Sequence, residues 1–99
     1  METNPKEVIR VHMWVKGRVQ NVGFRAHVEY HALQIGVFGW VRNIGPDIVE
    51  TVAEGTRMQI AEFIEMVKQG PRSSHIDDAR VEFEPLTGQL TGFDVKRNM

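Results

Sequence analysis

The 99-residue sequence predicts a single α+β domain, an antiparallel sheet with two helices packed on one of its faces. Segments with the alternating pattern of strands and segments with the period of helices follow one another in the order β-α-β-β-α-β. Each helical segment has one apolar stripe, so each has one face to bury against a sheet. The length suits one domain, and 41% apolar with 25% charged residues is an ordinary globular composition.

The first half of the chain contains three of these elements. Residues 8–15 alternate apolar and polar side chains, which is the pattern of a half-buried strand. In residues 24–35 the apolar positions recur at helical spacing, and Gly36 follows as a residue type that commonly ends a helix. Residues 37–43 are aromatic and β-branched, which predicts the second strand.

A hairpin and a second helix follow. Residues 44–47, Ile-Gly-Pro-Asp, have the composition of a turn, and residues 48–54 form the strand after it. Thr56 with Gln59 three positions later fits a capping box, which predicts the start of a helix. That helix ends at the Gly-Pro pair of residues 70–71, because proline cannot continue it.

Two more strands complete the predicted fold. Residues 76–83 form the fourth strand, and residues 93–96 predict a short extra strand at the C-terminal end. This order of elements is the ferredoxin-like arrangement, a βαββαβ sandwich. We expect residues 1–7 to be an N-terminal tail and residues 8–99 to form the domain.

Composition narrows the possible functions. The absence of cysteine excludes a disulfide scaffold, a thiolate metal site and a cysteine nucleophile. The sequence has no apolar run that could span a membrane and no signal-peptide pattern, so we expect a cytoplasmic protein with no membrane partner. Residues 1–45 carry a net charge of +3 and residues 46–99 of −4. This asymmetry is too mild for general nucleic-acid binding but suits a local site for a small anion.

The most informative stretch is residues 16–25, Lys-Gly-Arg-Val-Gln-Asn-Val-Gly-Phe-Arg, where a strand enters a loop that leads into a helix. Backbone N–H groups in such a loop, together with the first N–H groups of the helix, can converge on an anion. Gly17, Asn21 and Gly23 are residue types that tolerate a left-handed backbone. Arg25 falls in the first helical turn, where it could contact phosphate or carboxylate through two N–H groups.

Better-known phosphate loops do not fit this stretch. It lacks the spacing and the Lys-Ser/Thr pair of a Walker A loop, and it is not a dinucleotide fingerprint. From the residues alone a second interpretation stays open, in which the glycines turn the chain and Arg25 lies in solvent.

Three segments together resemble the acylphosphatase family. They are Gly-Arg-Val-Gln-Asn-Val-Gly-Phe-Arg at 17–25, Gly-Trp-Val-Arg-Asn at 39–43 and Val-Glu-Thr-Val-Ala-Glu-Gly at 49–55, in the family's order and separation. The likeness continues in residues 70–74 and 93–95, so it covers nearly the whole chain. That family consists of small ferredoxin-like hydrolases that cleave carboxyl-phosphate anhydrides without a metal.

The resemblance implies an enzyme with no cofactor and no metal site. It implies a small-molecule acyl phosphate as substrate, and a carboxylate and inorganic phosphate as products. It further implies two catalytic residues, Arg25 to bind the phosphoryl group and Asn43 to hold the attacking water. The expected phosphate-binding residues are Gly17, Arg18, Val19, Gln20, Asn21, Val22, Gly23, Phe24 and Arg25.

The chemistry of an acyl phosphate agrees with these residue types. Its leaving group is a carboxylate, so the reaction needs no general acid. The protein has to bind a dianion, place a water in line and stabilise charge on the phosphoryl oxygens. A neutral Asn43 can orient the water by hydrogen bonding, whereas a carboxylate at that position would repel the substrate.

Two positions depart from the family's pattern. Asn21 stands where the family usually has glycine, and its β-carbon could narrow the phosphate cradle, although we expect activity to survive. The turn at residues 44–47 replaces the common Asp-Gly turn, which should change the hairpin geometry just after Asn43.

Three other groups of residues have simpler explanations than a ligand site. His27 and His31 have the spacing of a metal-binding pair but no third ligand, so we expect exposed helix histidines. Residues 77–78, two aspartates, are expected to be a solvated strand start. Trp14 and Trp40 lack the aromatic pattern of RNA-recognition modules, so packing in the core or at an edge is expected.

We therefore expect a monomeric enzyme that hydrolyses acyl phosphates and binds no nucleic acid. One alternative is a non-catalytic acylphosphatase-like domain that binds phosphate or a carbamoyl phosphate group in the same cradle. The other is a nucleic-acid-binding ferredoxin-like module, against which the mild charge and the missing aromatic pattern argue.

Overall fold

The computed structural model, which describes residue 4 and residues 6–98, confirms the predicted order of elements. The elements are β1 Val8–Arg18, α1 Phe24–Ile35, β2 Phe38–Ile44, β3 Ile48–Thr56, α2 Arg57–Gln69, β4 His75–Glu84 and β5 Phe93–Val95. The first strand begins at Val8, as expected, and most of the expected tail 1–7 lies outside the described residues.

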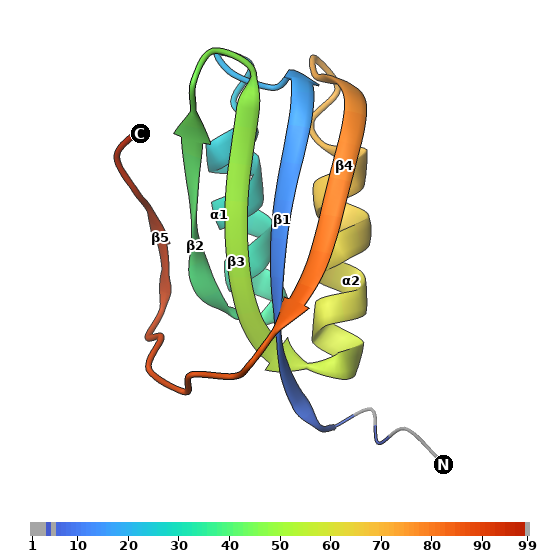
Figure 1. The fold of residues 1–99 in the computed structure, drawn as a ribbon, viewed down its shortest axis with the longest axis vertical. Helices are drawn as coiled ribbons and strands as arrows, with labels where there is room; N and C mark the ends of the chain where they lie inside the picture. The colour runs from blue at the N-terminus through green and yellow to red at the C-terminus, as the bar shows by residue number, and fades with distance from the viewer. Residues whose placement is uncertain (1–3, 5, 99) are drawn as a thin grey trace.

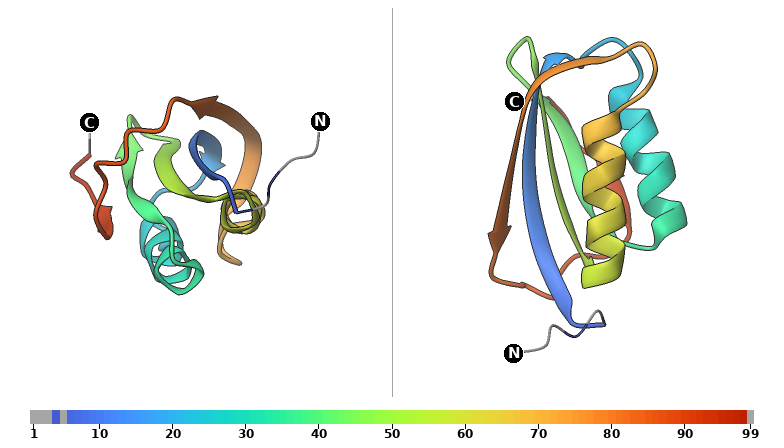
Figure 2. Two further views of the ribbon diagram at one scale, coloured as in Figure 1. Left: turned by 90° about the horizontal axis from the view of Figure 1, so that it is seen from below. Right: turned by 90° about the vertical axis from the view of Figure 1, so that its right-hand side faces the viewer.

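The strands form one sheet in the order β4-β1-β3-β2-β5, and both helices cover the same face of it (Figures 1 and 2). The α+β class and the ferredoxin-like arrangement are thus confirmed. The four long strands pair antiparallel, as predicted. The sheet is nevertheless mixed, because β5 pairs with β2 in parallel. Residues 85–92 cross one end of the sheet after β4, so β5 enters the opposite edge in the direction of β2 (Figure 1).

The first strand is longer than the sequence predicts, and its extension forms the start of the expected loop. Gly17 and Arg18 pair with β4 beyond a register shift that follows Lys16. A β-carbon on Gly17 would lie 2.2 Å from the carbonyl oxygen of His75, and Gly17 has a φ of 142°. Glycine is therefore required at this point of the pairing between β1 and β4.

The two helices begin in different ways. The predicted capping box of α2 is confirmed: the Thr56 hydroxyl accepts from the Gln59 N–H at 3.1 Å, and the Gln59 side chain accepts from the Thr56 N–H at 2.9 Å. The α1 helix begins after Gly23, which provides no side-chain cap, and ends at Gly36 in a left-handed conformation. No described helix is long and apolar enough to cross a membrane.

The core lies between the helices and the sheet. Its largest fully buried side chains include Phe24 of α1, Phe63 and Ile60 of α2, and Met13 of β1. Phe24, Ile60 and Phe63 belong to the predicted apolar stripes of the helices, and Met13 belongs to the apolar side of the first predicted strand. Burying them together holds both helices on one face of the sheet.

The opposite face of the sheet carries a network of charged side chains. Each ring nitrogen of His12 lies 2.6 Å from a carboxylate oxygen, one of Glu50 and one of Glu84. Arg10 donates to Glu84 at 3.1 Å and to Glu54 at 3.0 Å. The hydrogen bonds from His12 and from Arg10 lower the pKa of Glu84 from its ordinary value of 4.5.

Both tryptophans lie on this open face, outside the helix–sheet core. Arg80 lies over the ring of Trp14, while Arg42 and Lys96 lie over the ring of Trp40. The expectation that they pack in the core or at an edge is wrong. Each alternates along its strand with the residues that face the helices, and β1 and β2 are both interior strands of the sheet. The cations leave them half-buried.

Because the folded-state pKa of Glu84 is lowered, this carboxylate stabilises the fold above pH about 4.5, and its contribution is lost as the pH falls further. We expect the free energy of unfolding to fall between about pH 5 and pH 3, and to fall less steeply in Glu84→Gln. Urea unfolding across this range measures the slope. Glu62→Gln, on the exposed face of α2, is the matched control. An equal slope in Glu84→Gln and wild type would contradict the assignment.

Candidate active site

The loop between β1 and α1 passes through two left-handed residues, Asn21 with φ 61° and Gly23 with φ 77°. Both are residue types that the sequence marks as tolerant of this conformation. Val19 is fully buried and anchors the start of the loop in the core. Because Gly23 caps α1 without a side chain, the first N–H groups of the helix have no partner within it.

The side chain of Gln20 ties this loop to the turn between β2 and β3. Its Nε2 donates to three carbonyl oxygens at 2.8–3.3 Å, those of Ile44, Gly45 and Ile48. The Gly17 N–H adds a bond of 3.0 Å to the carbonyl oxygen of Asp47. Since Asn43 immediately precedes this turn, these bonds fix the loop relative to Asn43.

The connection between α2 and β4 supports the loop from its other side. The Ser73 hydroxyl donates to the Val22 carbonyl oxygen at 3.1 Å. Gly70 packs so closely on Phe24 that a β-carbon there would lie 2.8 Å from the phenyl ring. Phe24 opens α1, so this contact also sets where the helix begins.

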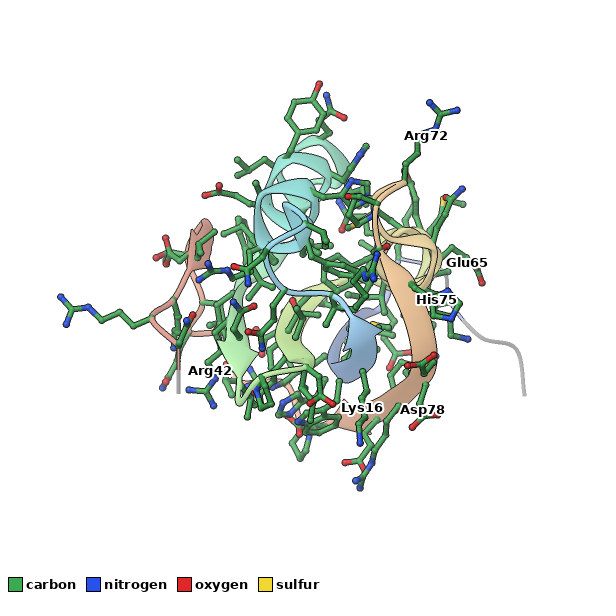
Figure 3. The ribbon with its side chains drawn as sticks, turned by 90° about the horizontal axis from the view of Figure 1, so that it is seen from above. Lys16, Arg42, Glu65, Arg72, His75 and Asp78 are labelled. Atoms are coloured by element: carbon green, nitrogen blue, oxygen red, sulfur yellow. The ribbon has the colours of Figure 1, made fainter. Side chains whose placement is uncertain are left out.

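A pocket of about 290 Å³ lies between the loop, the start of α1 and the edge of the sheet. Its lining residues are Val19, Gln20, Asn21, Gly23, Phe24, Arg25, Ala26, Glu29, Asn43 and Val95. Figure 3 looks onto this end of the molecule, and the labelled side chains of Lys16, Arg42 and Arg72 point outward from it. Among the described residues that line the pocket, Arg25 is the one with a positive charge.

Arg25 lies in the first turn of α1 and is half-buried. Its Nη1 donates to the side-chain oxygen of Asn98 at 2.9 Å. The segment after β5 continues alongside β2, where the Lys96 N–H donates to the Val41 carbonyl oxygen at 2.8 Å. The C-terminal segment therefore forms one wall of the pocket and holds the guanidinium.

Asn43 is the buried polar residue of the pocket, with 5% of its surface exposed. Its side-chain oxygen Oδ1 has no hydrogen-bond partner among the described residues. Most buried acceptors in proteins have a partner, and leaving one unpaired is costly, so this oxygen has an unused capacity to accept a hydrogen bond.

The pocket brings Arg25 and Asn43 together with most of the predicted phosphate-binding residues. Gly17, Arg18 and Val22 are not among its lining residues. The first two belong to β1, and the Gly17 N–H is engaged by the β2–β3 turn. The Val22 carbonyl is engaged by the α2–β4 connection.

Three lining residues, Ala26, Glu29 and Val95, were not predicted from the sequence. Glu29 follows Arg25 by four residues on one helix, so the helical period could have placed it at the site. Val95 could not be found in this way, because it reaches the pocket through the parallel pairing of β5.

His27 and His31 adjoin one another on α1, with ring centroids 4.5 Å apart. The expectation that they are exposed is wrong: both are half-buried, because their rings pack against those of Phe24 and Tyr30. Burial, and secondly the nearby His31, lower the pKa of His27 from 6.5. In residues 4 and 6–98 no group of three or more metal-binding side chains occurs.

The family model for acylphosphatase matches residues 11–95. The chain belongs to the acylphosphatase family. An acylphosphatase of Trichormus variabilis is 44% identical to it over 95 residues, which are 96% of this chain and 93% of the relative.

Two solved acylphosphatases have the same fold. The crystal structure of acylphosphatase from Bacillus subtilis has a TM-score of 0.84 at 33% identity, covering 89% of this chain and 98% of that one. The structure from Coxiella burnetii has a TM-score of 0.86 at 30% identity, covering 97% and 100%. This acylphosphatase-family chain is therefore a hydrolase that acts on small acyl phosphates.

Asn21 adopts a left-handed backbone, which an alanine tolerates less well than asparagine or glycine. We expect Asn21→Ala to lower the free energy of unfolding by about 1 kcal/mol and Asn21→Gly to leave it unchanged. Urea unfolding of both variants measures the difference.

Asn21→Gly also removes a β-carbon from the pocket lining, so its KM for an acyl phosphate should be lower than that of wild type. An unchanged KM would show that the β-carbon does not narrow the cradle.

Proposed function

We propose that this pocket is the active site, in which Arg25 and the backbone N–H groups of residues 19–25 bind the phosphoryl group and Asn43 holds the attacking water. The observation that carries the proposal is the unpaired Oδ1 of Asn43, buried in the wall of the pocket that Arg25 also lines. A water molecule can donate one hydrogen to this oxygen and keep a lone pair directed at phosphorus.

The reaction proceeds by in-line displacement at phosphorus. The water oxygen forms a bond to phosphorus while the bond from phosphorus to the carboxyl oxygen breaks. The electron pair of the broken bond leaves with the carboxylate, and both protons of the water end on inorganic phosphate. Because a carboxylate is stable as an anion at neutral pH, the step needs no acid to protonate the leaving group.

The protein lowers the barrier by electrostatic stabilisation and positioning. Charge spreads over the phosphoryl oxygens in the transition state, and the guanidinium of Arg25 and the N–H groups at the start of α1 face them. Each charge-assisted hydrogen bond contributes about 1.5–3 kcal/mol. A donor held in place before the reaction can contribute about 10²–10³ in rate.

Asn43→Ala should keep substrate binding and lose turnover, because it removes the group that orients the water. We expect kcat to fall at least about a hundredfold while inhibition by inorganic phosphate changes little. Release of phosphate from benzoyl phosphate in the presence of EDTA measures turnover. A near-normal kcat in Asn43→Ala would show that another group positions the water.

Arg25→Ala should lose both binding and turnover, because the guanidinium is the cation that lines the pocket. We expect a higher KM, weaker inhibition by inorganic phosphate and a loss of kcat of about 10²-fold or more. The matched control is Arg72→Ala, which removes an exposed cation from the same end of the molecule (Figure 3).

Saturable binding of phosphate by wild type without any turnover of acyl phosphates would instead select the non-catalytic domain. The cytoplasmic location, the monomeric state and the absence of a nucleic-acid partner stay predictions.

A further inference from the structure

Glu29 places a negative charge in a pocket that has to bind a dianion. It is the carboxylate among the described residues that line the pocket, and it is half-buried. It follows Arg25 by four residues on α1, so the two side chains project from the same side of the helix, one turn apart. A like charge close to the phosphoryl group opposes substrate binding, so its presence requires an explanation.

The simplest explanation is an ion pair between Glu29 and Arg25, since the spacing allows one. The structure pairs the guanidinium with Asn98 instead. None of the ion pairs within residues 4 and 6–98 includes Glu29. Glu29 is therefore not used to hold Arg25, and its charge is available to a ligand.

The acyl group of the substrate has one direction in which to extend. In an in-line displacement, the attacking water and the leaving oxygen lie on opposite sides of phosphorus. Asn43, on β2, holds the water against the sheet, so the acyl group points away from the sheet. The lining residues on that side of the pocket are Ala26 and Glu29 of α1, one apolar side chain and one carboxylate.

We propose that Glu29 determines specificity and that the preferred substrates are acyl phosphates whose acyl group carries a positive charge, such as an ammonium group. The inference rests on the function proposed above. The apolar part of the acyl group contacts Ala26, and the cationic group pairs with the Glu29 carboxylate. This pairing offsets the repulsion that Glu29 exerts on the phosphoryl dianion, which an uncharged acyl group cannot do.

The test compares substrates of equal shape and different charge. The probes are the para and meta isomers of (trimethylammonio)benzoyl phosphate, each matched with its tert-butyl analogue. The readout is the kcat/KM for the cationic substrate divided by the kcat/KM for its neutral analogue. The cationic substituent also makes the carboxylate a better leaving group, so the ratio of wild type is compared with that of Glu29→Gln. We expect wild type to prefer the cationic member roughly three- to tenfold more strongly than Glu29→Gln does, for at least one isomer. This preference should decrease at high salt, because ions screen the pair.

Glu29→Gln keeps the size of the side chain and removes its charge, so we expect it to lower the ratio to the value that leaving-group reactivity alone sets. Glu65→Gln, on the exposed side of α2 and away from the pocket, should keep the wild-type ratio (Figure 3). If Glu29 has a structural role, both rates fall together in Glu29→Gln and the ratio persists, which overturns the inference.

The two proposals fail in distinguishable ways. Hydrolysis of the neutral substrates with the same ratio in wild type and Glu29→Gln for both isomers overturns the specificity of Glu29 and leaves the active site in place. Absence of hydrolysis of every acyl phosphate, the cationic ones included, overturns the proposed function and the inference with it.

Discussion

The site depends on the hydrogen bonds that join the β1–α1 loop to the β2–β3 turn. The loop and Asn43 belong to different segments of the chain, and an in-line reaction tolerates little error in their relative position. The Gln20 amide contacts three carbonyl oxygens around the turn, and the Gly17 N–H contacts a fourth. An apolar side chain of similar size could not replace Gln20, because these carbonyls would lose their donor. These bonds thus couple the geometry of the pocket to that of the β2–β3 hairpin. They hold the loop in place against the Ile-Gly-Pro-Asp turn that follows Asn43.

The fifth strand and the residues after it supply a wall of the pocket and a partner for Arg25, which the four long strands do not provide. Residues 85–92 carry the chain across the end of the sheet, and β5 then runs parallel to β2 toward the pocket (Figure 1). Val95 contributes apolar lining, and Asn98 accepts from Arg25. The guanidinium is therefore oriented by a neutral oxygen rather than by a carboxylate. A carboxylate partner would offset the positive charge that a bound phosphoryl group requires.

The sequence predicted the elements well, because the apolar periods of strands and helices are local features. It also predicted the loop with its left-handed Asn21 and Gly23, since few residue types tolerate that conformation. It did not predict the extension of β1 through Gly17 or the direction of β5, because both depend on pairing with strands distant in the chain. The open face was misjudged for a related reason. The sequence left Trp14 between the core and an edge, because the cation over its ring, Arg80, comes from β4, which is distant in the chain.

The two helices begin differently: a cap stabilises the start of α2, whereas the uncapped start of α1 leaves N–H groups for an anion. A full capping box satisfies the first N–H groups of α2, a device that stabilises a helix by about 1 kcal/mol. The α1 helix has no such cap and no acidic residue in its first turn, so the N–H groups at its start, next to the pocket, have no side-chain partner. In the proposed site, serine or aspartate at position 23 would compete with the phosphoryl group for these N–H groups. The left-handed φ of Gly23 also disfavours such residues. Because α1 has no cap, the N–H groups at its start can donate hydrogen bonds to a bound phosphate.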